Sequence, residues 1–225
     1  MTATTTPRDV AARRLLVRVI AAIAAITTLI AVINLSPLID RYAVQELLDV
    51  NGENTLVAWL SSALLLAIAV AAFVGAITSS SHRDRRGWSA MAVFFVVLSA
   101  DETASMHELA GEIANRFVDI AWLPSLYMWV LVVVPFAAAV AVWMFVWLRK
   151  TLGTGTPSMR LAAGALALWL VVPVLEAVDP SLGGPLVLVV IEESLEIVGE
   201  LMMLAAVALH LIDRGVRVVA QDQAA

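Results

Sequence analysis

The chain has 225 residues, of which 61% are hydrophobic and 15% charged, and a formal net charge of −5 at pH 7. Several apolar runs approach twenty residues, the length that an α-helix needs to cross a bilayer, so we expect an all-α, multi-pass membrane protein. The absence of cysteine excludes thiolate catalysis, iron–sulfur clusters and cysteine-ligated zinc. The basic residues form short flanks beside apolar segments, so no nucleic-acid partner is expected.

Hydropathy divides the chain into six apolar segments of a single transmembrane domain, 1–225. The predicted helices lie at about 15–38, 55–78, 87–112, 122–149, 160–178 and 185–212. The first segment has a basic flank like that of a signal peptide. It is long for one and lacks a small-residue cleavage site, so we interpret it as a retained helix.

The basic residues predict the orientation of these helices. Cytoplasmic loops of membrane proteins are rich in Lys and Arg. Twelve of the 14 basic residues fall beside the N-terminus, the second loop, the fourth loop and the C-terminus. Both termini are therefore predicted to lie on the cytoplasmic side of the cell membrane.

The third segment places acids inside a span. Its apolar run has only 13 residues, so a full crossing has to include the polar residues that follow. These are Asp101, Glu102, Ser105, His107 and Glu108. On a regular helix Ser105 and Glu108 share a face with Asp101, Glu102 lies beside that face, and His107 points elsewhere.

The last segment carries four glutamates, Glu192, Glu193, Glu196 and Glu200, in an otherwise apolar stretch. They fall within a sector of about 100° on a helix. A carboxylate at the centre of a membrane helix costs roughly 2.5–3.5 kcal/mol, so this face is expected to point into the protein. Asp101 and Glu192 both lie roughly 10 Å below the outer surface, so contact between the third and sixth helices would join their acids in one site.

These acids predict an intramembrane carboxylate cluster that opens outward and binds a cation. Oxygen ligands suit Ca²⁺, Mg²⁺ and Mn²⁺, and Zn²⁺ also accepts them. The expected metal ligands are Asp101, Glu108, Glu192, Glu193 and Glu196. Supporting roles are expected for Glu102, Ser105, His107 and Glu200 and, from the second segment, for Glu53, Asn54, Ser61 and Ser62.

Three functions are compatible with this cluster. In a hydrolase, a metal would polarise a lipid-like substrate and activate water, with Glu193, Glu196 and Asp101 as the catalytic residues. In a transporter, the carboxylates would bind and release a cation or protons, but the cytoplasmic half of the sixth segment has no carboxylate, which favours an outward-facing pocket. In a structural protein, the acids would be protonated and hydrogen-bonded together.

Two strings resemble segments of small bacterial polytopic membrane proteins of uncharacterised activity: Glu53-Asn-Thr-Leu-Val-Ala-Trp-Leu-Ser-Ser62 and Ser99-Ala-Asp-Glu-Thr-Ala-Ser-Met-His-Glu108. The similarity covers most of the chain and implies a bacterial cytoplasmic membrane. A weaker likeness is to the alkaline ceramidase group of membrane hydrolases, in which a zinc-bound water attacks an amide. Its motifs resemble Glu53-Asn54, Ser61 or Ser62, and Asp101-Glu102. The chain departs from that group at Glu192 to Glu196, where the group has a His-x-x-x-His pair.

Overall fold

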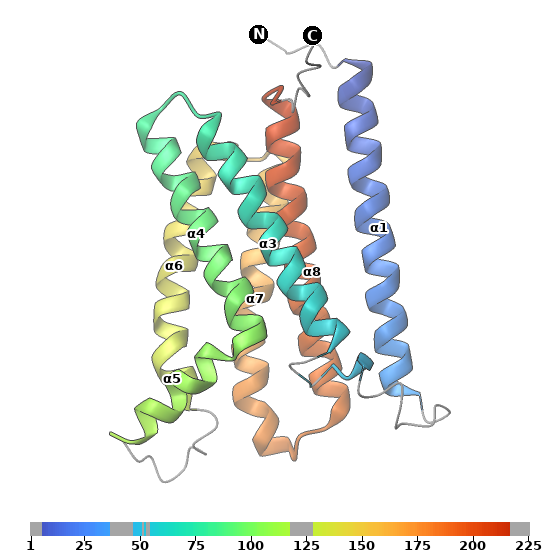
Figure 1. Cartoon of the computed structure of the whole chain (residues 1–225), viewed down its shortest axis with the longest axis vertical. Helices are drawn as coiled ribbons and strands as arrows, with labels where there is room; N and C mark the ends of the chain where they lie inside the picture. Colours follow the sequence, from blue (N-terminus) through green and yellow to red (C-terminus); the bar gives the residue numbers. More distant parts are fainter. Residues whose placement is uncertain (1–5, 37–46, 51, 53–54, 118–127, 217–225) are drawn as a thin grey trace, which may run out of the picture.

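The computed structural model describes residues 6–36, 47–50, 52, 55–117 and 128–216, which are helical apart from short turns and contain no strand. The helices are α1 (Pro7–Leu35), α3 (Leu56–Ile77), α4 (His82–Ala104), α5 (Met106–Asn115), α6 (Met128–Leu152), α7 (Pro157–Leu182) and α8 (Leu186–Asp213). The long helices run side by side as a bundle, and the short α5 turns away at one end of it (Figure 1).

Five of the described helices are long and apolar enough to cross a membrane. They are Asp9–Leu35, Leu56–Ile77, Val134–Leu152, Pro157–Leu175 and Leu186–Asp213. The 23 residues of α4 have sufficient length, but charged residues at both of its ends lower its mean hydropathy. These findings confirm the all-α, multi-pass membrane class expected from the sequence.

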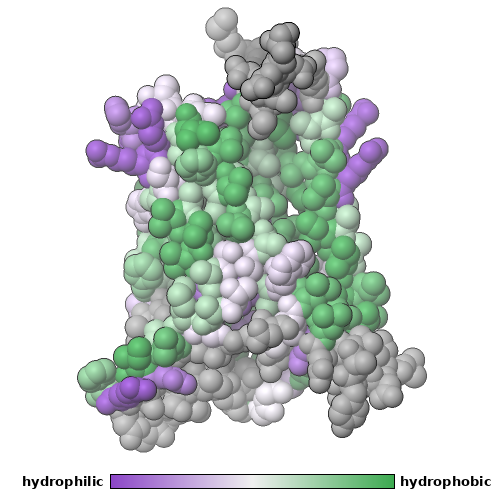
Figure 2. Space-filling model, in the orientation of Figure 1, coloured by the Kyte–Doolittle hydropathy of each residue, from purple (hydrophilic) through white to green (hydrophobic). Residues whose placement is uncertain are grey.

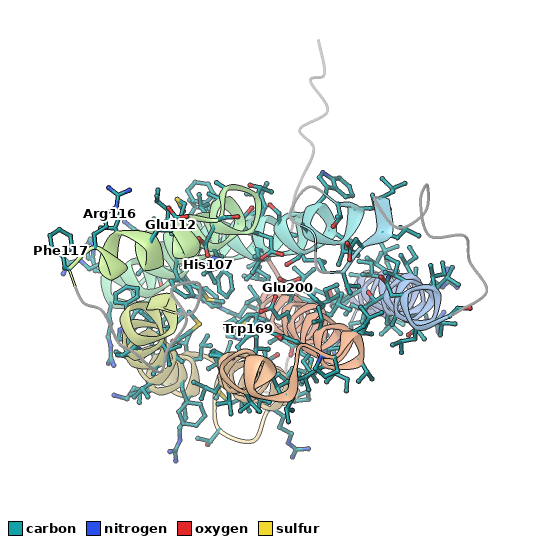
Figure 3. The ribbon with its side chains drawn as sticks, turned by 90° about the horizontal axis from the view of Figure 1, so that it is seen from below. His107, Glu112, Arg116, Phe117, Trp169 and Glu200 are labelled. Atoms are coloured by element: carbon teal, nitrogen blue, oxygen red, sulfur yellow. The ribbon has the colours of Figure 1, made fainter. Side chains whose placement is uncertain are left out.

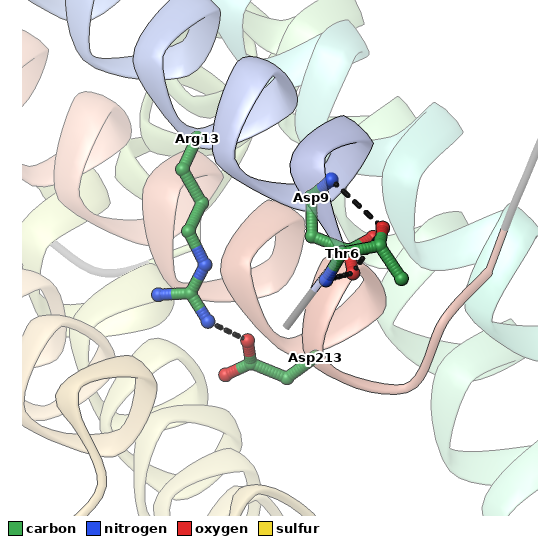
Figure 4. A network of polar contacts seen from close by, with 4 residues as sticks. All are labelled: Thr6, Asp9, Arg13 and Asp213. Carbon is green, nitrogen blue, oxygen red and sulfur yellow. Dashed lines mark hydrogen bonds and ion pairs between the residues drawn. The ribbon is translucent and has the colours of Figure 1, made fainter. Parts of the chain in front are cut away.

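The start of α1 is capped by its own side chains and tied to the end of α8. The backbone N–H of Thr6 donates to Asp9 Oδ2 (2.8 Å), and Thr6 Oγ1 accepts the N–H of Asp9 (3.3 Å). This capping box starts the helix at Pro7, earlier than the predicted residue 15. Arg13, one turn further, forms an ion pair with Asp213 (Figure 4).

The prediction of one continuous third helix over 87–112 is wrong, because the helix breaks at Ser105. Ser105 adopts the left-handed conformation, with φ 47° and ψ 43°, and separates α4 from α5. Its N–H donates to the carbonyl of Asp101 (2.8 Å), which closes the last turn of α4. The side chain of Asp101 accepts the backbone N–H of His107 (2.8 Å) at the start of α5. The polar side chain thus satisfies a free helix-terminal N–H and stabilises the break.

Large side chains packed on glycines hold the bundle together. A Cβ on Gly87 would lie 2.3 Å from the indole of Trp147, and one on Gly199 would lie 2.7 Å from Nε1 of Trp169. Trp147 also contacts Trp88 edge to face, with ring centroids 4.9 Å apart. The apolar layer, which lies in the half of the bundle away from α5, consists of Trp88, Met91, Phe95, Met144, Met203 and Val207, each at most 1% exposed.

The two ends of the bundle differ in charge. We call the basic end the one that holds the start of α1, the turn between α3 and α4, and the ends of α6 and α8 (Figure 1). Hydrophilic side chains project from its corners, above a broad apolar band (Figure 2). The opposite, acidic end holds the end of α4, α5 and the start of α8. The carboxylates predicted to form a site lie on this acidic side.

Candidate functional site

The four glutamates of α8 line its inner side. Glu200, at the middle of the helix, is 2% exposed, and Glu192, Glu193 and Glu196 are partly buried. They succeed one another from the acidic end of the bundle towards its centre. The acidic half of α8 therefore presents carboxylates to the interior of an otherwise apolar bundle.

Glu200 makes a hydrogen bond across the helix interface to α3. Its Oε1 accepts a bond from Ser61 Oγ (2.6 Å), and Ser61 is fully buried. Its other oxygen, Oε2, is buried without a hydrogen-bond partner. A buried acceptor left unsatisfied costs about 1–3 kcal/mol, and more when it is charged. This oxygen is positioned to hold a proton or a bound cation.

Glu102 brings a carboxylate of α4 into the same group. Glu196 interacts electrostatically with Glu193, Glu102, Glu200 and Glu192, and Glu200 interacts with Glu102 and Glu193. We call these five residues the carboxylate cluster. The cluster joins acids of α4 and α8, which were expected at similar depths in the membrane. The α4 carboxylate that interacts with Glu196 and Glu200 is that of Glu102, whereas the sequence predicted Asp101 as the α4 ligand.

Asp101 pairs instead with His107. Asp101 Oδ2 lies 3.0 Å from His107 Nδ1, and Oδ1 accepts the His107 backbone N–H. The two side chains are 23% and 30% exposed, respectively. The expectation that His107 points away from Asp101 is wrong, because it assumed a regular helix through Ser105. The backbone of Ser105 forms the helix break that brings Asp101 and His107 together. Among the described residues, its side chain makes no hydrogen bond to a site residue.

Three further side chains, from α3, α4 and α7, make hydrogen bonds beside the cluster. Ser62 donates to the carbonyl of Ser99 (2.8 Å), and Ser99 Oγ donates to the carbonyl of Ser62 (2.9 Å), which fixes α3 against α4. Trp169 Nε1 of α7 donates to the carbonyl of Glu196 (3.4 Å). Trp169 is not among the site residues predicted from the sequence. Its ring also packs against Gly199, a small residue on the facing side of α8.

Viewed from the acidic end, Trp169, Glu200 and His107 lie around the interior of the bundle, whereas Arg116 and Phe117 point away from it (Figure 3).

Glu53 and Asn54 lie outside the described residues, as does the side chain of Glu108. Among the residues that the structure describes, no group of three or more His, Asp or Glu side chains could hold one metal ion. The predicted five-ligand metal site includes Glu108, whose side chain lies outside the described residues, so this site stays a prediction.

Comparison with known proteins gives one match. The model of a family described as a domain of unknown function (DUF8692) matches residues 16–211, a range that includes α3 to α7, nearly all of α8 and the carboxylate cluster. No curated protein and no solved structure matches the chain.

Proposed function

The chain belongs to the DUF8692 family, and we propose that it is a six-span membrane protein that binds a cation at its carboxylate cluster from the outer side of the membrane. The observation that carries this proposal is the carboxyl group of Glu200. It is buried at the centre of a membrane-spanning helix, bonded by Ser61 through one oxygen and unpartnered at the other. Glu102, Glu193 and Glu196 interact electrostatically with it, and Glu192 interacts with Glu196.

The orientation follows from the distribution of charge. α4 runs beside α3 along the bundle and has the length of a span, so we take it as the sixth crossing (Figure 1). Cytoplasmic flanks are enriched in Lys and Arg, which assigns the basic end to the cytoplasm together with both termini. The carboxylate cluster then lies in the outer half of the membrane.

A positive ion compensates the charge of the cluster. Carboxylates in apolar surroundings are costly, and like charges brought together add to that cost. Protons shared among the acids remove this repulsion without any change in geometry. A divalent metal would compensate the same charge, with Glu108 as a further ligand that the sequence predicts. The elemental analysis and the spectroscopy below distinguish the metal from the proton.

The geometry favours binding from one side over passage through the protein. Between Glu200 and His210, α8 rises about 15 Å. The inward-facing side chains in this interval include Met203 and Val207, which are fully buried in the apolar layer with Trp88 and Phe95. Among the described residues this layer offers no polar side chain to relay a cation. Transport and lipid hydrolysis stay predictions from the sequence, as do the catalytic roles of Glu193, Glu196 and Asp101.

The test compares wild-type protein, purified in mild detergent without chelator, with the Glu193→Gln/Glu196→Gln and Glu200→Gln variants. Glu112→Gln, which neutralises an exposed acid on α5, is the matched control. Elemental analysis measures bound metal, and infrared spectroscopy measures the protonated carboxyl band. We expect the carboxyl band in wild type and control, and a weaker band in both cluster variants.

A near-stoichiometric metal that is lost only from the cluster variants would also support the cation site and would identify its ion. Neither a metal nor a protonated carboxyl group in the wild-type protein would contradict the proposal. The same would follow if Glu112→Gln changed both signals as much as the cluster variants do.

A further inference from the structure

A second polar site lies at the basic end, across the apolar layer from the carboxylate cluster. A pocket of about 320 Å³ opens between the first turn of α4 and the last turns of α6 and α8. Pockets for small ligands have volumes of about 300–1,000 Å³, so this one has room for a small polar group. None of the residues of the carboxylate cluster contributes to its walls.

The walls of this pocket carry excess positive charge. Arg83, Lys150 and Arg214 line it, against the single carboxylate of Asp84. Within the described part of the chain, none of these three cations forms an ion pair, although Arg13 at the same end does so with Asp213. Three helices thus bring cationic side chains to one cavity, and no ion pair with a described residue neutralises their charge. An anionic ligand would supply the missing charge.

The floor of the pocket is preformed. Trp147 and His210 line it, and both rings pack against Trp88, with centroids 4.9 Å and 5.8 Å from it. Gly87 allows Trp147 this close approach to α4. The aromatic floor separates the cations from the apolar layer, so a bound anion would lie where the apolar band of the surface ends. This is the depth at which lipid headgroups carry their phosphates.

We propose that this pocket binds a phosphate group, supplied either by an anionic lipid headgroup or by a soluble phosphate. Arginine pairs with phosphate oxygens through two parallel N–H groups, and lysine adds a point charge. Basic pockets between membrane helices on the cytoplasmic side bind such headgroups. The inference is independent of the cation site, because it uses other residues at the opposite end.

The test uses the full-length protein and the Arg83→Gln/Lys150→Gln variant. Arg86→Gln/Arg149→Gln is the matched control, because it removes the same charge from the same two helix ends at exposed residues that do not line the pocket. Each protein is equilibrated with phosphatidylglycerol in detergent, and native mass spectrometry measures the lipid that it retains. A parallel arm adds millimolar inorganic phosphate and measures the displacement of lipid and the shift in melting temperature.

We expect wild type and control to retain one phosphatidylglycerol, and the pocket variant to lose affinity by about tenfold or more. Arg214→Gln, which changes a different helix, should weaken binding in the same direction. Displacement of the lipid by inorganic phosphate would show that a soluble phosphate can occupy the pocket. Retention of the lipid in the presence of inorganic phosphate would identify the lipid headgroup as the ligand. Equal binding by all four proteins, or equal loss in the control, would overturn the proposal. So would a wild-type protein that responds to neither probe.

Discussion

At the scale of single residues, Ser105 determines the geometry of the acidic end. It is the only non-glycine residue with positive φ among those described. A left-handed conformation costs an L-residue with a Cβ roughly 1–2 kcal/mol. The contacts between Asp101 and His107 offset this cost by satisfying the start of α5. Asp101 and Glu102 point in directions about 100° apart on α4, and the break brings His107 to the first of them.

We predict that Ser105→Gly stabilises the protein by about 0.5–1 kcal/mol, because glycine adopts positive φ without a steric penalty. Ser194→Gly, the same replacement inside α8, should destabilise it by several tenths of a kcal/mol because glycine has a low helix propensity. Unfolding in detergent, followed by circular dichroism, gives both values. A Ser105→Gly variant as unstable as Ser194→Gly would show that the left-handed turn is not a feature of the folded protein.

At the scale of helices, small residues decide which elements approach closely. The glycines of α3, α4 and α8 accept tryptophan rings from their neighbours, as expected in membrane helices, where close packing takes over the role of the hydrophobic effect. Gly87 forms the closest of these contacts, with Trp147. Gly164 is also close to a side chain, but its neighbour is the flexible terminal methyl of Met202. The two positions therefore differ in how readily a new methyl group is accommodated.

We predict that Gly87→Ala destabilises the bundle by about 1–3 kcal/mol, because the rigid indole of Trp147 has to move and overpacking of a core has a cost of this size. Gly164→Ala should be close to neutral, because Met202 can rotate away and alanine has the higher helix propensity. Thermal unfolding of the two variants in one detergent makes the comparison. Equal destabilisation would mean that the Trp147 contact does not limit the approach of α4 and α6.

At the scale of the whole molecule, charge is separated between the two ends of the bundle. The basic end gathers the starts and ends of helices that are far apart in the sequence, and the acidic end gathers the carboxylates. Between them lies the apolar band of the surface (Figure 2). The orientation can be tested by labelling single introduced cysteines, because the chain contains no cysteine of its own that would give background labelling.

We predict that, in intact cells, a membrane-impermeant maleimide labels Arg116→Cys on the acidic end but not Ser80→Cys in the turn between α3 and α4. Both native side chains are exposed, so burial does not explain a difference between them. Thr154→Cys, in the exposed turn after α6, should follow Ser80→Cys and serves as an independent position. Labelling of Ser80→Cys alone would show that the orientation is the reverse of the one proposed. Labelling of Ser80→Cys and Arg116→Cys together would contradict six crossings.

The class of this protein follows from its sequence, because long apolar runs have to be helical in a bilayer, where every backbone polar group needs an internal partner. It also identified the face of α8 that carries Glu192 to Glu200, since helical periodicity assigns faces without tertiary information. The break at Ser105 was not predictable in this way, because it depends on the balance between a local strain and two contacts of Asp101. The tertiary structure alone decided the choice of Glu102 over Asp101, the bond from Ser61 to Glu200, and the pocket at the basic end. These features depend on distances between helices, and those distances follow from the packing of the whole bundle.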